Sequence, residues 1–103
     1  MTRKDRALRF ALAPDVVIVW ERSSHPPIEY AIVLLAERDG AWHTVRTFDN
    51  AHGEREHHEH AYDGDLKQPP TVTDGDVSAV MHAALRSLRR GWPAIVSAWE
   101  TTR

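Results

Sequence analysis

The fold is decided by residues 29–48, which read EYAIVLLAERDGAWHTVRTF. The first nine residues are almost continuously apolar and of strand length. Such a run is typical of a central strand that is covered on both faces or by a partner. Asp39 and Gly40 then supply the positive φ angles that a tight hairpin turn needs. Residues 42–48 follow as a second strand, so this stretch predicts an antiparallel hairpin.

Further strands are predicted on both sides of this hairpin. Residues 15–21, DVVIVWE, are rich in β-branched side chains and lie between two proline-containing segments. Residues 55–63 follow a turn at 49–53, and Thr71 with Val72 adds a short edge pairing. The basic arm at 1–14 reads as a short helix or an edge strand. We therefore expect an antiparallel meander of about four strands within residues 15–72.

A C-terminal helical segment is predicted over residues 73–101. Thr73 followed by Asp76 is a helix-start signal, with Thr73 as the cap. The apolar residues after it recur with a period of 3.6. They are Val77, Met81, Ala84, Leu85, Leu88, Trp92, Ile95, Val96 and Trp99. Pro93 interrupts this stripe and predicts a kink or a break. The whole chain is thus predicted to be one α+β domain with its sheet packed against this helix.

Composition narrows the classes of function. The chain has 103 residues, 27% of them charged, and a formal net charge of −2. This balance argues against nucleic-acid binding by the whole surface and leaves only a local basic patch. There is no cysteine, which excludes disulfides, thiolate metal sites and cysteine nucleophiles and favours a cytoplasmic protein. No apolar run reaches the length of a membrane span.

Histidine is the compositional outlier. There are seven, and four of them, His52, His57, His58 and His60, fall within nine positions. If residues 55–63 form a strand, alternate side chains share a face, which places His58, His60 and Tyr62 together. Two imidazoles two residues apart on one face lie roughly 6–7 Å apart.

This spacing suits general acid–base chemistry without a metal. His58 and His60 could deprotonate a ribose 2′-hydroxyl and protonate the leaving 5′-oxygen, because histidine titrates near neutral pH. His52 would lie beside this pair. Tyr62 could stack on a base or donate a proton. The sequence therefore predicts His58, His60, His52 and Tyr62 as catalytic residues of a ribonuclease.

Substrate-binding residues are predicted nearby. Arg46 on the neighbouring strand and Arg55 in the histidine strand could hold phosphate. Trp42, just after the hairpin turn, is a candidate surface aromatic. Alternation along residues 42–48 predicts that Trp42, Thr44, Arg46 and Phe48 share one face.

Two other interpretations of the histidines stay open. His52, His58 and His60 could bind Zn²⁺ or another divalent metal. The segment could equally be a solvated edge strand whose charges protect it from aggregation. A basic stripe on the helix, formed by His82, Arg86, Arg89 and Arg90, could likewise contact RNA phosphate or an acidic partner, or be plain surface.

Residues 48–53, FDNAHG, and 58–62, HEHAY, resemble a family of short uncharacterised bacterial proteins. Those proteins have the same turn, a histidine-rich strand and a C-terminal helix. More distantly, DNAH at 49–52 with HHEH at 57–60 is similar to TumE-like toxins of type II toxin–antitoxin modules. The second resemblance implies a toxin with a cognate antitoxin as its partner.

The leading hypothesis is thus a bacterial, cytoplasmic, toxin-like endoribonuclease that binds RNA and needs no cofactor. The alternative from another class is a non-enzymatic protein-binding module or a homodimer. In that alternative, the histidine cluster is structural or binds a metal.

Overall fold

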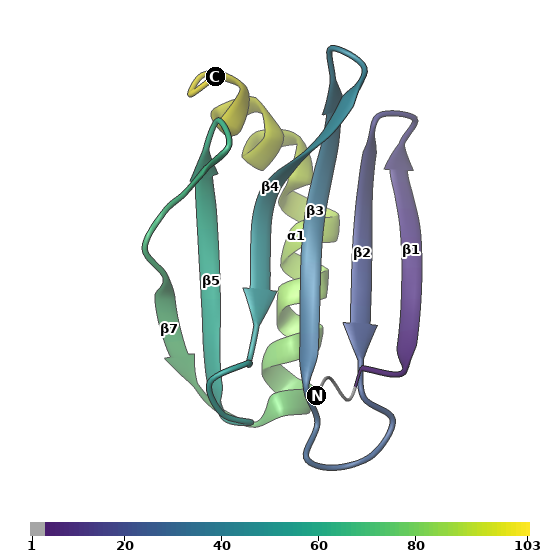
Figure 1. Cartoon of the computed structure of the whole chain (residues 1–103), viewed down its shortest axis with the longest axis vertical. Helices are drawn as coiled ribbons and strands as arrows, with labels where there is room; N and C mark the ends of the chain where they lie inside the picture. The colour runs from purple at the N-terminus through teal and green to yellow at the C-terminus, as the bar shows by residue number, and fades with distance from the viewer. Residues whose placement is uncertain (1–3) are drawn as a thin grey trace.

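A computed structural model describes residues 4–103 and confirms the α+β class (Figure 1). The elements are β1 (Arg6–Ala13), β2 (Val16–Arg22), β3 (Tyr30–Arg38), β4 (Ala41–Asp49), β5 (Glu56–Asp63), β6 (Leu66–Lys67), β7 (Thr71–Asp74) and α1 (Val77–Glu100). The sheet has seven strands rather than about four. The basic arm forms edge strand β1 rather than a short helix, and the segment after Asp63 adds β6. β7 confirms the predicted short pairing at Thr71 and Val72.

The sheet is an antiparallel meander in which consecutive strands are neighbours. Its order is β1-β2-β3-β4-β5-β6, and β7 also pairs with β5. The β3–β4 hairpin turns at Asp39 and Gly40, whose φ angles are 55° and 78°, as the Asp-Gly signal predicts. β1 therefore lies at one end of the sheet, and the histidine strand β5 lies towards the other.

One face of the sheet packs against α1, which lies behind the strands in Figure 1. The core consists of alternate residues of β2 and β3, Val45 of β4 and the apolar stripe of α1. Its buried members are Val16, Ile18, Tyr30, Ile32, Leu34, Ala36, Val45, Met81, Ala84, Leu85, Leu88, Val96 and Trp99. The predicted helix stripe is thus confirmed as the side that packs on the sheet.

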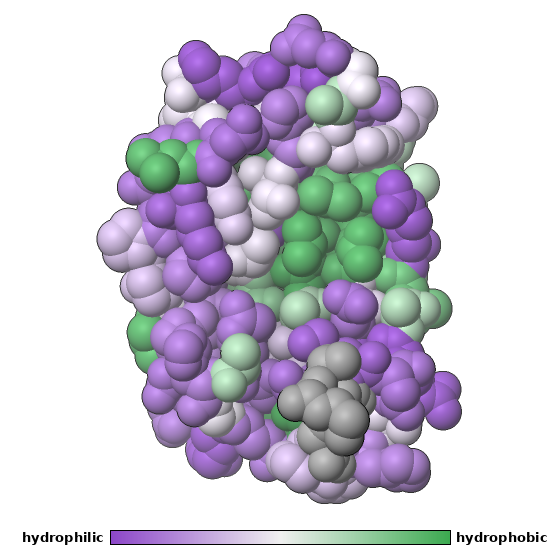
Figure 2. Space-filling view, viewed as in Figure 1, coloured by the Kyte–Doolittle hydropathy of each residue, from purple (hydrophilic) through white to green (hydrophobic). Residues whose placement is uncertain are grey.

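The other face of the sheet, called the open face below, is covered by no element within residues 4–103. By alternation it carries Val17 and Val19 of β2 and Val33 and Leu35 of β3. Figure 2 shows this face, with an apolar area over the β2–β3 region and polar side chains around it.

The helix starts and continues differently from the prediction. Thr73 belongs to β7, and the N-cap is Asp76, whose carboxylate accepts a hydrogen bond from the Ala79 N–H at 2.9 Å. α1 runs without a break through Pro93, so the predicted break is wrong, whereas the alternative of a kink stays a prediction. Leu88 and Val96 are buried on either side of Pro93, and this packing offsets the backbone hydrogen bond that proline cannot donate.

A β-bulge in β4 overturns the predicted face of residues 42–48. Leu34 pairs with Arg46, whereas Leu35 pairs with Thr44, so Val45 is an extra residue in the strand. Trp42 and Thr44 lie on the open face, but Arg46 and Phe48 lie on the helix side. Simple alternation fails here because the bulge shifts the pattern by one residue. As the extra residue of the bulge, Val45 places its side chain in the core.

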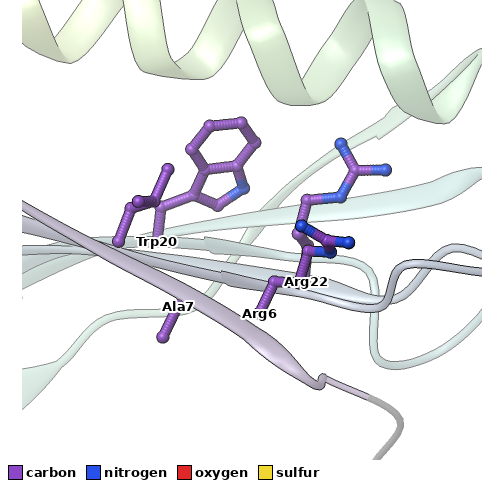
Figure 3. Close-up of a pocket in the computed structure, with 5 residues that line it drawn as sticks. Arg6, Ala7, Trp20 and Arg22 are labelled. Atoms are coloured by element: carbon purple, nitrogen blue, oxygen red, sulfur yellow. The ribbon is translucent and has the colours of Figure 1, made fainter.

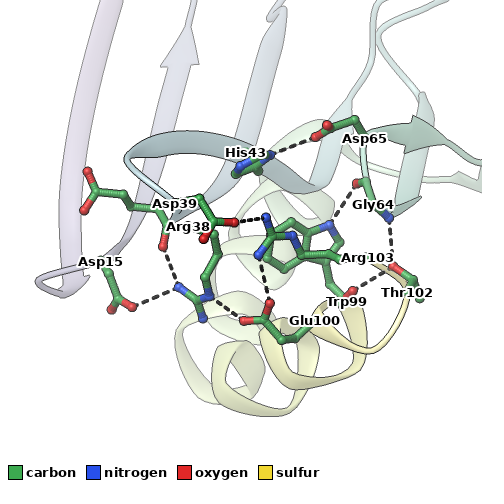
Figure 4. A network of polar contacts seen from close by, with 11 residues as sticks. Asp15, Arg38, Asp39, His43, Gly64, Asp65, Trp99, Glu100, Thr102 and Arg103 are labelled. Carbon is green, nitrogen blue, oxygen red and sulfur yellow. Dashed lines mark hydrogen bonds and ion pairs between the residues drawn. The ribbon is translucent and has the colours of Figure 1, made fainter.

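The end of α1 is held by charged residues from two turns (Figure 4). The Arg38 guanidinium donates to Glu100 through Nε and to Asp15 through Nη1, the latter at 2.9 Å. Arg103 donates to Asp39 at 2.8 Å and to Glu100 at 3.1 Å. Glu100 therefore connects the helix end to the β1–β2 and β3–β4 turns.

The turn after β5 is tied to the same helix end. Trp99 Nε1 donates to the Gly64 carbonyl at 2.9 Å, and the Gly64 N–H donates to Thr102 Oγ1 at 2.8 Å. Gly64 has a φ of 56°, a left-handed conformation that glycine adopts without steric cost. The C-terminal end of α1 and the residues after it are thus connected to three turns of the sheet, β1–β2, β3–β4 and β5–β6.

Replacing Glu100 tests this connection. The Arg38 hydrogen bond, followed by that of Arg103, holds the pKa of Glu100 below its ordinary value of 4.5. A carboxylate with a depressed folded-state pKa stabilises the fold above its unfolded-state pKa, and this contribution is lost as pH falls through the folded value. We expect Glu100→Gln to lower the melting temperature near neutral pH and to flatten its decrease below about pH 4.5. Circular dichroism melts across this pH range measure both effects.

Glu37→Gln is the matched control, since that side chain is exposed and makes no ion pair within residues 4–103. Equal pH profiles for Glu100→Gln and the unmodified protein would contradict the proposed contribution of Glu100.

Candidate functional site

Three of the predicted histidines converge on the open face. His58 and His60 project from the same side of β5, with ring centroids 6.2 Å apart, as the predicted strand spacing requires. His52, in the turn after β4, stacks on His58 with a centroid distance of 4.5 Å and an interplanar angle of 25°. The structure therefore brings His52, His58 and His60 into one row, called the histidine row below.

Hydrogen bonds hold two rings of the row in place. His58 Nε2 lies 2.7 Å from a Glu56 carboxylate oxygen, and His60 Nδ1 lies 2.8 Å from the Gln68 carbonyl. Carbonyl and carboxylate oxygens only accept, so the bonded nitrogens carry the hydrogens. Within residues 4–103, His58 Nδ1 and His60 Nε2 have no protein partner. Each ring thus keeps one nitrogen without a protein partner in the described chain, and the His58 side chain is 12% exposed.

Residues of β4 form the surface beside the row. Thr47 pairs with His60, and Asp49 pairs with His58. The Thr47 hydroxyl is buried and has no hydrogen-bond partner in the described part of the chain. Asp49 accepts a hydrogen bond from the Ala51 N–H at 3.0 Å, which shapes the turn that carries His52.

Tyr62 follows His60 on the same side of β5 but is partly buried and packs against the core. A role for its hydroxyl as a proton donor stays a prediction.

The predicted arginines do not both accompany the row. Arg46 lies on the opposite side of the sheet, where its Nη1 pairs with Glu59 at 2.7 Å. Its buried Nε has no partner in the described chain. Arg55 lies just before β5, with its side chain 63% exposed and 3.6 Å from Asp74. Of the two arginines, Arg55 is the more exposed, and its ion-pair partner is Asp74.

Trp42 lies on the open face and is 40% exposed, in keeping with its predicted place at the surface. The Arg9 guanidinium stands over its ring at 5.6 Å from the centroid. Trp42 is five residues along β4 from Thr47, which corresponds to about 15 Å. It is therefore a separate aromatic surface on the same side of the sheet as the row.

His57 belongs to the structural framework rather than to the row. It is only 4% exposed, and its ring bonds to Tyr30 Oη at 2.7 Å and to the Gly75 carbonyl at 2.9 Å. Nε2 must donate to the carbonyl, so Nδ1 accepts from the Tyr30 hydroxyl. Burial, with a smaller effect of Asp49, raises the pKa of Tyr30 and keeps that donor protonated. His57 thus connects β3 and β5 to the segment that precedes α1.

Asn50 has a structural role that the sequence does not predict, because the pattern shows it only as part of the turn at 49–53. It is buried, and its Oδ1 accepts from the Tyr30 N–H at 2.9 Å. Its Nδ2 donates to the carbonyls of Ile28 at 2.7 Å and Glu54 at 3.2 Å. Asn50 therefore fixes the turn that presents His52 to His58.

No cluster of three or more histidine, aspartate or glutamate side chains within residues 4–103 is arranged to hold a metal ion. The absence of a cofactor stays a prediction. No helix of the described chain combines the length and the apolarity needed to cross a membrane. Comparison with known proteins finds no matching family model, curated protein or solved structure.

Asn50→Ala tests the buried amide. The change leaves the Tyr30 N–H and two carbonyls without partners, and we expect a loss of about 2–4 kcal/mol in the free energy of unfolding. Urea unfolding followed by tryptophan fluorescence measures it.

Gln68→Ala is the control, because the exposed Gln68 side chain bonds only to the Leu66 carbonyl while its main chain still serves His60. A loss for Asn50→Ala no larger than that of the control would show that the amide does not fix the turn.

Proposed function

We propose that the histidine row cleaves single-stranded RNA without a metal, as the toxin of a toxin–antitoxin pair. The observation that carries the proposal is the pair of imidazoles 6.2 Å apart on the open face, each oriented by a hydrogen bond to one ring nitrogen. The likeness of residues 49–52 and 57–60 to TumE-like toxins supports the same class and implies a cognate antitoxin.

The proposed reaction assigns one proton transfer to each ring. His60 Nε2 takes the proton of a ribose 2′-hydroxyl, and the resulting oxygen attacks the adjacent phosphorus. His58 Nδ1 gives a proton to the 5′-oxygen as its bond to phosphorus breaks. The products are a 2′,3′-cyclic phosphate and a 5′-hydroxyl. Glu56 orients His58 in the way that the carboxylate of a catalytic triad orients its histidine.

The remaining predicted residues serve RNA binding in this proposal. Arg55 is exposed one residue before Glu56 in the chain and can exchange Asp74 for a phosphate. Trp42, with Arg9 over its ring, offers a stacking surface for a base further along the strand. Arg46 takes no part, because it lies on the other side of the sheet.

The double change His58→Ala with His60→Ala tests the acid–base pair. General acid–base groups contribute about 10²–10⁴-fold to a rate, so we expect loss of RNA cleavage and of growth inhibition on expression. Cleavage by the unmodified protein is measured on a labelled RNA in the presence of EDTA, and the 3′ ends are examined for cyclic phosphate.

His25→Ala is the matched control, since His25 is exposed in the β2–β3 loop. Cleavage that survives the double change, or that EDTA abolishes, would rule out the proposed metal-independent pair.

A second candidate function is protein binding through the apolar part of the open face. Val17, Val19, Val33 and Leu35 lie side by side on β2 and β3 with no element over them in the described chain. Val17 is only 5% exposed, and the other three are partly exposed. Figure 2 shows an apolar area over this part of the sheet. Exposed contiguous apolar patches commonly mark contacts between proteins. A second copy of the chain could cover this area as a homodimer.

Light scattering coupled to size-exclusion chromatography tests this candidate. A homodimer has twice the 11.7 kDa mass of the chain, and the double change Val19→Glu with Val33→Glu should convert it to a monomer. A monomeric unmodified protein would exclude the homodimer. Far-ultraviolet circular dichroism confirms that the variant remains folded.

A further inference from the structure

On the helix side of the sheet, side chains of β1 and β2 form a pocket. A cavity of about 270 Å³ lies there, lined by Arg6, Ala7, Leu8, Trp20 and Arg22. Figure 3 shows the side chains of Arg6, Trp20 and Arg22 on the side of the sheet that faces α1, while Ala7 points away. This cavity is called the arginine pocket below.

Neither arginine of the pocket forms an ion pair within residues 4–103, although Arg22 Nε donates to the Ser23 carbonyl at 3.1 Å and the Arg22 guanidinium stands 6.0 Å from the centroid of the Trp20 ring. Arg6 and Arg22 are directly opposite each other in the β1–β2 register. Like charges in this position destabilise a sheet. Asp5 acts on Arg6 through charge, but its oxygens accept hydrogen bonds from Ser24 N and Oγ at 2.8 and 2.6 Å. The pocket therefore favours an added anion.

The pocket holds one further donor, and this donor has no acceptor in the described chain. The Trp20 indole N–H is buried and has no hydrogen-bond partner in the described chain. Figure 3 places this nitrogen on the side of the ring towards Arg22. Buried donors without partners are rare in folded proteins. Two guanidinium groups and an indole N–H thus gather where the protein supplies few acceptors.

The pocket also borders a free strand edge. β1 is the end strand of the sheet and pairs only with β2 within residues 4–103. Leu8, beside the pocket, is 54% exposed, and Phe10 follows it on the same side with the Arg89 guanidinium 5.8 Å from its ring centroid. An unpaired edge binds an extended polypeptide by main-chain hydrogen bonds. RNA cannot form that ladder, so this feature favours a peptide over nucleic acid.

We propose that an acidic, extended segment of a partner protein adds to the edge of β1 and places a carboxylate in the arginine pocket. Alternate side chains of the added strand face the helix side. One acidic residue then lies level with Arg6, and apolar residues lie level with Leu8 and Phe10. The positive charges of Arg6 and Arg22 favour an acidic residue, and the free edge of β1 favours an extended polypeptide, so both features fit an acidic extended segment. This site is on the opposite side of the sheet from the histidine row and does not depend on RNA cleavage.

Nuclear magnetic resonance of the ¹⁵N-labelled chain tests the proposal with two synthetic peptides. The first alternates valine and threonine over about nine residues and carries one glutamate, placed to match the strand pattern. The second has glutamine in place of the glutamate. We expect the first to shift both the β1 amide signals and the Trp20 indole signal, which is assigned with Trp20→Phe. The second should bind at least about tenfold more weakly, because it lacks the charge-assisted hydrogen bond.

Arg6→Gln should weaken binding of the glutamate peptide by a similar factor of about ten. Lys67→Gln is the matched control, because Lys67 is an exposed cation on β6, at the other end of the sheet from β1, and it should leave binding unchanged. The dispersion of the amide spectrum reports whether each variant is folded.

Inorganic phosphate and a short single-stranded RNA are tested alone as rival occupants. Shifts of the Trp20 indole signal with either of them, with no response of the β1 amides to the peptide, would overturn the proposal. Equal binding of the two peptides would overturn it as well.

Discussion

The burial of one helix against one face of the sheet is the interaction on which the rest of the structure depends. Leu88 and Met81 of α1 pack with Ile32 and Leu34 of β3, and all four are almost completely buried. Each such side chain contributes roughly 1.5–3 kcal/mol relative to leaving it exposed. A helix is about 10 Å wide and strands are about 4.8 Å apart, so one helix covers only two or three strands. A seven-stranded sheet therefore keeps uncovered areas.

Both proposed sites lie in these uncovered areas. The histidine row occupies the face that α1 does not reach, and the arginine pocket lies on the helix side at the far β1–β2 end. The bulge at Val45 adds to this division, because it gives a valine to the core and turns Arg46 to the helix side. The Arg46 charge is thereby removed from the side of the sheet that carries the histidine row, whereas Arg55 stays exposed and pairs with Asp74.

Neighbouring histidines of β5 have different tasks because a strand alternates its sides. His57 is buried and exchanges hydrogen bonds with Tyr30 and Gly75, so it stabilises the fold. His58 faces the open side one residue later, and His52 reaches it only because Asn50 fixes the intervening turn. The same residue type thus serves the framework and the candidate site, and the side of the strand decides which.

The sequence by itself determined the elements that depend on local pattern. The Asp39-Gly40 turn, the helix stripe and the shared side of His58 and His60 follow from positive φ, the 3.6 period and the two-residue strand repeat. The tertiary structure alone decided the bulge at Val45, the buried partners of Asn50 and the assembly of Arg6, Arg22 and Trp20. These features depend on which strands pair and in what register. That is a competition between distant segments for one core, and no local pattern encodes its outcome.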